Sequence, residues 1–220
     1  MTASTLPIDK LQSLTEDQFN LIQTIKREYE TGMLAINSLS RHTATVYGGS
    51  LIKSNDKDYK AIENISQLLS EKNWSIISGG GPGVMSAALS GAKLGKGQAI
   101  ALCIDIPGEP PFSHPDLSIT FSQFSVRKYL LRQSDVFIFA PGGVGTLDEL
   151  MEILTLIKTH KHPVKKIFLY DSEFWNGYIS WLENMLIKER KVILGDFMGL
   201  FHLVDSPEEI MNILGYEGSF

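Results

Sequence analysis

The sequence predicts an α/β protein with a doubly wound parallel sheet and an N-terminal helical extension. From residue 43 onward, short apolar runs typical of buried parallel strands alternate with stretches of helical periodicity. Glycine-rich turns follow three of these runs, at strand ends where ligands bind in such sheets. The length of 220 residues, with 43% hydrophobic and 20% charged residues, suits one globular domain. Together these observations indicate a Rossmann-like topology.

The first segment of the chain is expected to lie outside the sheet. We expect residues 1–42 to form the helical extension and residues 43–220 the Rossmann-like domain. Between Ser13 and Leu39, apolar residues recur at close to helical spacing. Thr15 stands before two acidic residues, which favours an N-terminal cap and a first turn matched to the helix dipole.

The strands are expected where short runs are rich in apolar, β-branched or aromatic residues. Each run ends at glycine, proline or polar residues, which are typical of turns. In chain order, the predicted strands are Thr43–Tyr47, Trp74–Ile77, Gln98–Ile104, Ile119–Phe121, Val136–Ala140, Val164–Tyr170 and Phe201–Val204.

The helices are expected where apolar residues recur every three to four positions between those strands. The predicted helices are Asp58–Lys72, Val84–Leu94, Val126–Ser134, Leu147–Thr159 and Phe174–Glu189, with one more at the end of the chain. Gly95–Gly97 is a stop signal for Val84–Leu94, and Ser206 followed by Pro207 is a start signal for the last helix.

Charge and residue counts exclude several classes of function. A net charge of −5 argues against binding to nucleic acid, although local arginines still allow a small anionic ligand. The N-terminus lacks an apolar signal core and no run approaches membrane-spanning length, so we expect a cytoplasmic protein without membrane contact. The single cysteine, Cys103, is interpreted as a packed thiol rather than a nucleophile. No histidine cluster has metal-ligand spacing, so no metal is expected.

The first two glycine turns are candidates for anion binding. Gly48 and Ser50 follow the first strand, where a tight turn explains them about as well as a ligand does. Gly80, Gly81 and Gly83 follow the second strand and open a helix, which makes a cradle for an anion. Their spacing differs from the dinucleotide fingerprint and from the P-loop, so both of those sites are disfavoured. Close helix–strand packing remains the alternative explanation.

The third turn combines glycines with carboxylates. Gly142, Gly143 and Gly145 free backbone amides, and Thr146 adds a hydroxyl donor near the expected helix start. Asp148 and Glu149 are expected in the first helical turn, where acidic residues complement the helix dipole; that accounts for the carboxylates but not for the glycines. We therefore expect this turn to bind an anion and to present Glu149 beside it.

A basic cluster leads into the strand that carries the third turn. Arg127 is the residue best placed to reach the crevice, where its guanidinium can fork onto phosphate or carboxylate. Lys128 and Arg132 fit a solvated helix face better.

Three segments, Ser78–Met85, Val126–Lys128 and Pro141–Glu149, resemble the signature motifs of the Lonely Guy family, long described as possible lysine decarboxylases. The resemblance runs from about Ala44 to about Leu214. It implies a phosphoribohydrolase, which cleaves the N-glycosidic bond of nucleoside 5′-monophosphates such as AMP or cytokinin nucleotides to free base and ribose 5-phosphate. A non-catalytic nucleotide sensor, or a glycosidase acting on another ribosyl 5′-phosphate, is the alternative.

The resemblance also implies roles for individual residues. Arg127 and Glu149 would be the catalytic pair, and no cofactor is expected because no lysine is singled out for pyridoxal phosphate. Substrate and phosphate contacts would come from Gly48, Ser50, Gly80, Gly81, Gly83, Lys128, Gly142, Gly143, Gly145 and Thr146. The loop Pro107–His114 is expected to border the base. A homodimer is expected, with the apolar helix Leu147–Ile157 as a candidate contact surface unless core packing explains it.

Overall fold

The structure is a computed structural model that describes residues 14–39, 42–193 and 195–216. A seven-stranded sheet runs through it in the order β4-β3-β2-β1-β5-β6-β7, and every neighbouring pair is parallel. The strands are β1 (Thr43–Tyr47), β2 (Ser75–Ser78), β3 (Ala99–Ile104), β4 (Leu117–Phe121), β5 (Val136–Phe139), β6 (Lys166–Tyr170) and β7 (His202–Val204). The predicted doubly wound, Rossmann-like sheet is confirmed.

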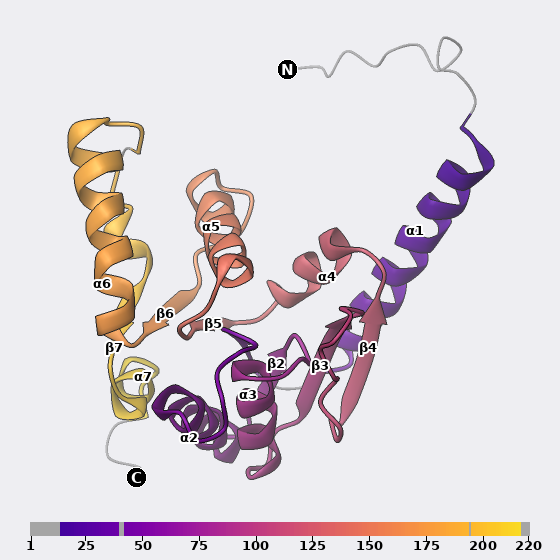
Figure 1. Cartoon of the computed structure of the whole chain (residues 1–220), viewed down its shortest axis with the longest axis horizontal. Coiled ribbons are helices and arrows are strands. Elements are labelled where there is room, and N and C mark those ends of the chain that lie inside the picture. The colour runs from indigo at the N-terminus through magenta and orange to yellow at the C-terminus, as the bar shows by residue number, and fades with distance from the viewer. Residues whose placement is uncertain (1–13, 40–41, 194, 217–220) are drawn as a thin grey trace.

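Helices cover both faces of the sheet (Figure 1): α2, α3 and α7 lie on one face, and α4, α5 and α6 lie on the other. The helices are α1 (Glu16–Asn37), α2 (Lys57–Glu71), α3 (Val84–Lys93), α4 (Phe124–Leu131), α5 (Val144–Lys158), α6 (Ser172–Trp181), the π-helix η2 (Leu182–Glu189), the 3-10 turn η3 (Met198–Leu200) and α7 (Pro207–Ile213). The helix predicted over Phe174–Glu189 is thus divided into α6 and η2. Within the described ranges, no helix combines the length and apolar character that crossing a bilayer requires.

The two central strands are buried along their whole length, as expected for parallel strands covered on both faces. Their side chains alternate between two apolar clusters, one on each face. Val46 and Ile138 pack with α2, α3 and α7, whereas Tyr47, Phe137 and Phe139 pack with α4, α5 and α6. This alternation fixes the face on which each side chain lies, so Tyr47, the last residue of β1, lies on the face covered by α4, α5 and α6.

The direction of winding reverses between β1 and β5. From β1 the chain proceeds outward through β2 and β3 to β4, and from β5 it proceeds the opposite way to β7. Successive connections at a reversal diverge, which leaves a crevice at the carboxyl edge of the sheet. The turns that follow β1 and β5 border this crevice.

Helix α5 begins at Val144, three residues earlier than predicted. Gly145 and Thr146 therefore belong to its first turn, whereas Asp148 and Glu149 lie in the second. The expected helix-start role of Asp148 and Glu149 is wrong, because the dipole acts mainly within the first turn. Four apolar side chains of α5, Leu150, Ile153, Leu154 and Ile157, are core residues. Core packing, the alternative to a subunit contact, accounts for them.

Helix α1 projects from the sheet as an arm and touches the rest of the protein mainly through α4 (Figure 1). Thr15 caps it as predicted, and a capping box with Gln18 completes the cap. Gly32 allows the approach to α4, because a Cβ there would collide with Leu130. Residues 1–13, 40 and 41 of the predicted extension lie outside the described residues.

Candidate active site

A cavity of about 510 Å³ lies at the carboxyl edge of the sheet, where the winding reverses. Its walls come from the turns after β1, β2 and β5, from the loop after β3, and from α4 and α5. The volume is within the range of small-molecule sites. The position is the one at which doubly wound sheets bind ligands.

The cavity brings most of the predicted site residues together. Those that line it are Gly48, Ser50, Gly80, Gly81, Arg127, Gly143, Gly145, Thr146 and Glu149. Gly83, Gly142 and Lys128 are not among its lining residues. The three glycine turns, the arginine and the glutamate therefore share one site, although they are spread over about half of the sequence.

The three turns are joined through Gly49. Its N–H donates to the carbonyl of Pro141 at 3.0 Å, and its carbonyl accepts from the N–H of Val84 at 3.0 Å. A Cβ on Gly83 would collide with the backbone of Gly49, and a Cβ on Gly142 would collide with Thr146. Close packing, the alternative explanation for the glycines, thus accounts for glycine at positions 83 and 142.

Two other glycines have no such packing requirement. A Cβ on Gly143 or Gly145 would meet no heavy atom within 4 Å. The protein's own packing therefore does not demand glycine at either position. Both line the cavity at the start of α5, where backbone amides are free to bind an anion.

Glu149 is a buried carboxyl group on the cavity wall, with 8% of its surface exposed. Burial raises its pKa to about 7, and the nearby charges of Lys128 and Arg127 offset only part of that effect. The group can therefore exchange a proton near neutral pH, which suits a general base or acid.

Arg127 is held by the ends of two strands. Its Nε donates to the Leu102 carbonyl at 2.7 Å, and its Nη2 lies 3.4 Å from the Gly79 carbonyl. Burial lowers the pKa of this guanidinium, and the charge of Glu149 acts in the opposite direction. The helix that carries Arg127 is itself fixed to the central strand, because the Thr45 hydroxyl donates to the Leu131 carbonyl at 2.7 Å.

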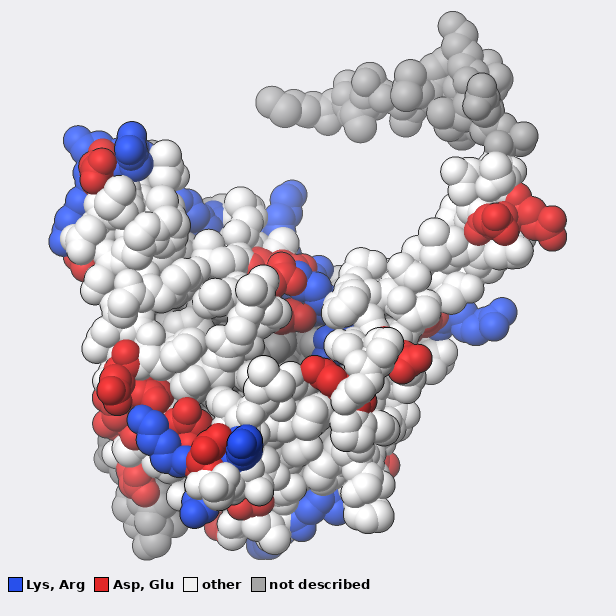
Figure 2. All heavy atoms as spheres, in the orientation of Figure 1, with Lys and Arg blue, Asp and Glu red and all other residues white. Residues whose placement is uncertain are grey.

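Lys128 points to the acidic residues of α5 instead of the cavity. Its Nζ lies 2.8 Å from Asp148 and 2.6 Å from Glu152, and Arg132 reaches Glu152 at 2.5 Å. We call these four side chains the α4–α5 ion cluster; Figure 2 shows the charges gathered between these helices. The solvated face predicted for Lys128 and Arg132 is wrong, because their side chains are only 15% and 18% exposed. Lys128 is also not among the lining residues, and its contact with a phosphate stays a prediction.

Several cavity residues were not predicted. Tyr47 is the last residue of β1, Cys103 is the last but one of β3, and Thr120 and Phe124 lie on β4 and α4. Cys103 is buried, as expected of a packed thiol, but it also faces the cavity. Their position in the sequence could have identified them, since each of these residues stands at or near the carboxyl end of a predicted strand.

The predicted border loop contributes Glu109 and Pro111 to the lining, whereas His114 is not among the lining residues. The cavity does not fit pyridoxal phosphate, because none of the described residues that line it is a lysine able to form the Schiff base. Among the described residues, no group of three or more histidine, cysteine, aspartate or glutamate side chains could hold a metal ion.

Comparisons with known proteins found a matching family model and several curated relatives. The family model described as possible lysine decarboxylase matches residues 85–214. A cytokinin riboside 5′-monophosphate phosphoribohydrolase from Rhodococcoides fascians is 22% identical over 178 residues, 75% of this chain and 90% of that protein. A protein of the same name from Mycobacterium tuberculosis is 27% identical over 128 residues, 56% of this chain and 67% of that protein.

Two solved structures are similar to the whole fold. A molybdenum cofactor binding protein from Rippkaea orientalis matches with a TM-score of 0.58 and 24% identity, over 80% of this chain and 97% of that one. The molybdenum cofactor carrier protein from Chlamydomonas reinhardtii matches with a TM-score of 0.54 and 20% identity, over 79% of this chain and 96% of that one. At these identities the likeness concerns the fold alone.

Proposed function

Because the chain belongs to the family described as possible lysine decarboxylase, the Lonely Guy family, we propose that it is a phosphoribohydrolase of nucleoside 5′-monophosphates. The products would be a free base and ribose 5-phosphate, with AMP-like or cytokinin nucleotides as substrates. The observation that carries this proposal is the convergence of Arg127, Glu149 and three glycine turns on one cavity.

The substrate phosphate would bind to the turns that follow β1 and β5. Gly143 is the N-cap residue of α5, and Gly145 and Thr146 lie in its first turn, where amide groups and the helix dipole favour an anion. The same side of the cavity includes Gly48 and Ser50. Binding through backbone amides adds no bulk, which leaves room for the ribose.

The base would occupy the opposite side of the cavity, which the β3 and β4 connections line. Ile106 and Phe124 come from these connections and Met85 from the start of α3, and all three line the cavity. Ile106 and Phe124 are 38% and 56% exposed, so their apolar surfaces are open to a planar ligand. The sheet order separates this apolar side from the glycine turns after β1 and β5.

The reaction requires stabilisation of a cationic ribosyl group. Cleavage of the C1′–N bond passes through a transition state with oxocarbenium character, as in glycoside hydrolysis. Ionised Glu149 would stabilise that cation and take a proton from the attacking water, whose oxygen forms the new C1′–O bond as the C1′–N bond breaks. The base leaves with the electron pair of that bond and takes up a proton, so one water is divided between the two products. Arg127 would keep Glu149 available as an anion and bind the substrate with the N–H groups that do not contact backbone carbonyls.

The alternative is a non-catalytic nucleotide-binding protein. The fold by itself does not decide between them, since structurally similar proteins bind or carry the molybdenum cofactor. What favours an enzyme is the buried Glu149, whose pKa of about 7 is costly to the fold and serves proton transfer.

The proposal is tested by incubating the protein with AMP, GMP, CMP, UMP and isopentenyladenosine monophosphate and measuring free base by chromatography. We expect at least one nucleotide to be cleaved, and Glu149→Gln to lower kcat by about a hundredfold or more. Glu71→Gln, which alters a carboxyl group on α2 away from the cavity, is the matched control. Full activity of Glu149→Gln would overturn the mechanism, and tight binding of a nucleotide without cleavage would favour the sensor.

A further inference from the structure

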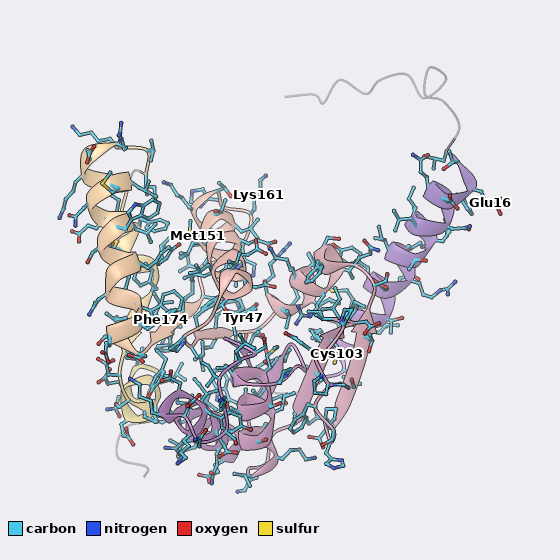
Figure 3. The ribbon with its side chains drawn as sticks, in the orientation of Figure 1. Glu16, Tyr47, Cys103, Met151, Lys161 and Phe174 are labelled. Carbon is cyan, nitrogen blue, oxygen red and sulfur yellow. The ribbon has the colours of Figure 1, made fainter. Side chains whose placement is uncertain are left out.

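Tyr47 occupies the centre of the candidate site. It is the last residue of β1, the strand from which the sheet winds in both directions, and it lines the cavity. Figure 3 shows it in the middle of the molecule below α5, with Cys103 on the side of β3. Its ring stacks on Phe139 at a centroid distance of 4.6 Å and an interplanar angle of 10°. The ring is therefore fixed by the core.

The hydroxyl of Tyr47 has no hydrogen-bond partner among the described residues, although the residue is only 6% exposed. Leaving a buried hydroxyl unpaired costs about 1–3 kcal/mol. Phenylalanine would fill the same space without that cost, and β1 and β5 already place phenylalanines in this core cluster. Packing alone thus gives no reason for the oxygen atom.

Glu149 and Arg127, the two charged residues of the proposed mechanism, both affect the pKa of this hydroxyl. Burial raises the pKa of Tyr47 well above its ordinary value, and the charge of Glu149 raises it further while Arg127 opposes. The phenol consequently keeps its proton, so it is available as a hydrogen-bond donor. The Glu149 carboxylate is an acceptor on the wall of the same cavity.

Tyr47 and Glu149, a donor and an acceptor, line the same cavity and together match a ligand group that can both accept and donate. A hydroxyl group meets this requirement, whereas a phosphate oxygen or an aromatic carbon does not. Hydrolysis of a nucleotide brings two such groups to the site, namely the attacking water and the hydroxyls of the ribose.

We propose that Tyr47 is a further substrate-contacting residue, whose hydroxyl donates a hydrogen bond to an O–H group that Glu149 also contacts. That group is either the attacking water or a ribosyl hydroxyl. The inference rests on the proposed phosphoribohydrolase function and adds to it a residue that fixes the reacting oxygen relative to Glu149. Because the ring is held by Phe139, the donor is in place before the substrate binds.

The test is Tyr47→Phe, measured as kcat, KM and melting temperature. We expect kcat/KM to fall by about tenfold to a hundredfold, the effect of one lost hydrogen bond in a buried site. The melting temperature should stay the same or rise, because the variant removes an unpaired polar group. Tyr178→Phe is the control, since Tyr178 is partly buried on α6 and is not a lining residue; its kinetics should not change.

Deoxynucleotides identify the oxygen that Tyr47 contacts. If it is a ribosyl hydroxyl, the penalty of Tyr47→Phe disappears with the 2′-deoxy or the 3′-deoxy substrate, and KM carries part of it. If it is the attacking water, the penalty persists with both and lies in kcat. Unchanged kcat and KM in Tyr47→Phe overturn the proposal. So does a loss of activity accompanied by a lower melting temperature, because the hydroxyl would then support the fold.

The role of Tyr47 can be tested even if the proposed phosphoribohydrolase activity is not found. If the wild-type protein cleaves no nucleotide, the phosphoribohydrolase proposal fails, and Tyr47 is then tested by calorimetric titration with AMP. If Tyr47→Phe has native stability but binds AMP about tenfold more weakly, the proposed hydrogen bond to a ribosyl hydroxyl is supported. Equal affinity of the two proteins for AMP would contradict it.

Discussion

The Glu149 carboxyl group is subject to opposing requirements, because burial favours its neutral form whereas a general base must be ionised. With a pKa of about 7, the reactive anion forms only as the pH rises through neutrality. We expect kcat/KM to increase from about pH 5 and to level off above about pH 8. The check is a pH–rate profile with the best substrate; a midpoint near the ordinary glutamate pKa of 4.5 would contradict it.

The same carboxyl group should make stability depend on pH. Its folded-state pKa lies above its unfolded value of 4.5, so between those two values the folded state binds the extra proton and stability falls as the pH rises. Glu149→Gln removes this effect and should be more stable than wild type by up to roughly 3 kcal/mol at about pH 8.

The stability advantage of Glu149→Gln should shrink as the pH is lowered through the folded-state value towards about pH 5. Urea denaturation of both proteins across this range measures it. An advantage that is equal at every pH would mean that ionisation of Glu149 is not its cause.

The glycines at the site are of two kinds, those that the protein's packing requires and those that it does not. Substitution by alanine should distinguish the two. Gly145→Ala should raise stability by up to about 1 kcal/mol, since alanine favours the helix and meets no neighbour, yet it should raise KM by obstructing the phosphate. Gly83→Ala should lower stability by more than about 1 kcal/mol, because its φ of +68° and its contact with Gly49 both exclude a Cβ. Thermal melts and substrate titrations measure the two effects.

Gly177→Ala is the control for this pair. Gly177 lies on α6 with no heavy atom near the position of a Cβ, and it is not a lining residue. The variant should gain stability without a change in KM. An unchanged KM in Gly145→Ala as well would remove the first turn of α5 from the phosphate site.

At the level of elements, α4 and α5 present the catalytic pair while the ion cluster ties the two helices together. Lys128 adjoins Arg127 in sequence and pairs with Asp148, which adjoins Glu149. Burial would lower the pKa of Lys128, but hydrogen bonds to Asp148 and Glu152 outweigh it and raise the pKa. Lys128 therefore keeps its charge near neutral pH.

Lys128→Gln should loosen this connection. We expect a loss of about 1–2 kcal/mol in the free energy of unfolding, because two carboxylates lose a shielded cation, and a several-fold fall in kcat as Arg127 and Glu149 lose their alignment. Lys26→Gln breaks an exposed pair with Glu30 on α1 and should cost less than about 0.5 kcal/mol. Equal effects of the two variants in chemical denaturation would rule out a special role for the cluster.

For the whole molecule, the pattern of apolar runs and glycine turns was sufficient to predict the parallel sheet, the succession of strands and helices along the chain, and the edge that carries the cavity. Each of these follows from local spacing or from a rule of parallel sheets. The predicted convergence of Arg127 with the third turn also follows, since the helix of Arg127 leads directly into β5.

The parts that could not be predicted depend on tertiary packing. The direction of Lys128 is set by the way α4 packs beside α5, which the sequence of neither helix contains. Helix α5 begins inside its glycine motif, where Thr146 packs against Gly142, a contact that helix propensity does not predict. Tyr47 looked like an ordinary strand residue, because its unpaired hydroxyl is visible only once its neighbours are in place.

The family resemblance implies a homodimer, which requires an apolar contact surface, and the buried residues of α5 are already used by the core. Two apolar side chains near the cavity remain almost fully exposed, Leu51 after β1 at 91% and Val144 at the start of α5 at 85%. We expect them to lie in the dimer contact, so light scattering on the wild-type protein should give twice the mass of one chain. Val144→Asp should shift it to monomer without loss of fold, since an acidic residue suits the first turn of a helix. Val164→Asp, an equally simple change at an exposed residue before β6, should remain dimeric. A monomeric wild type, or a dimer that tolerates Val144→Asp, would place the contact elsewhere or remove it.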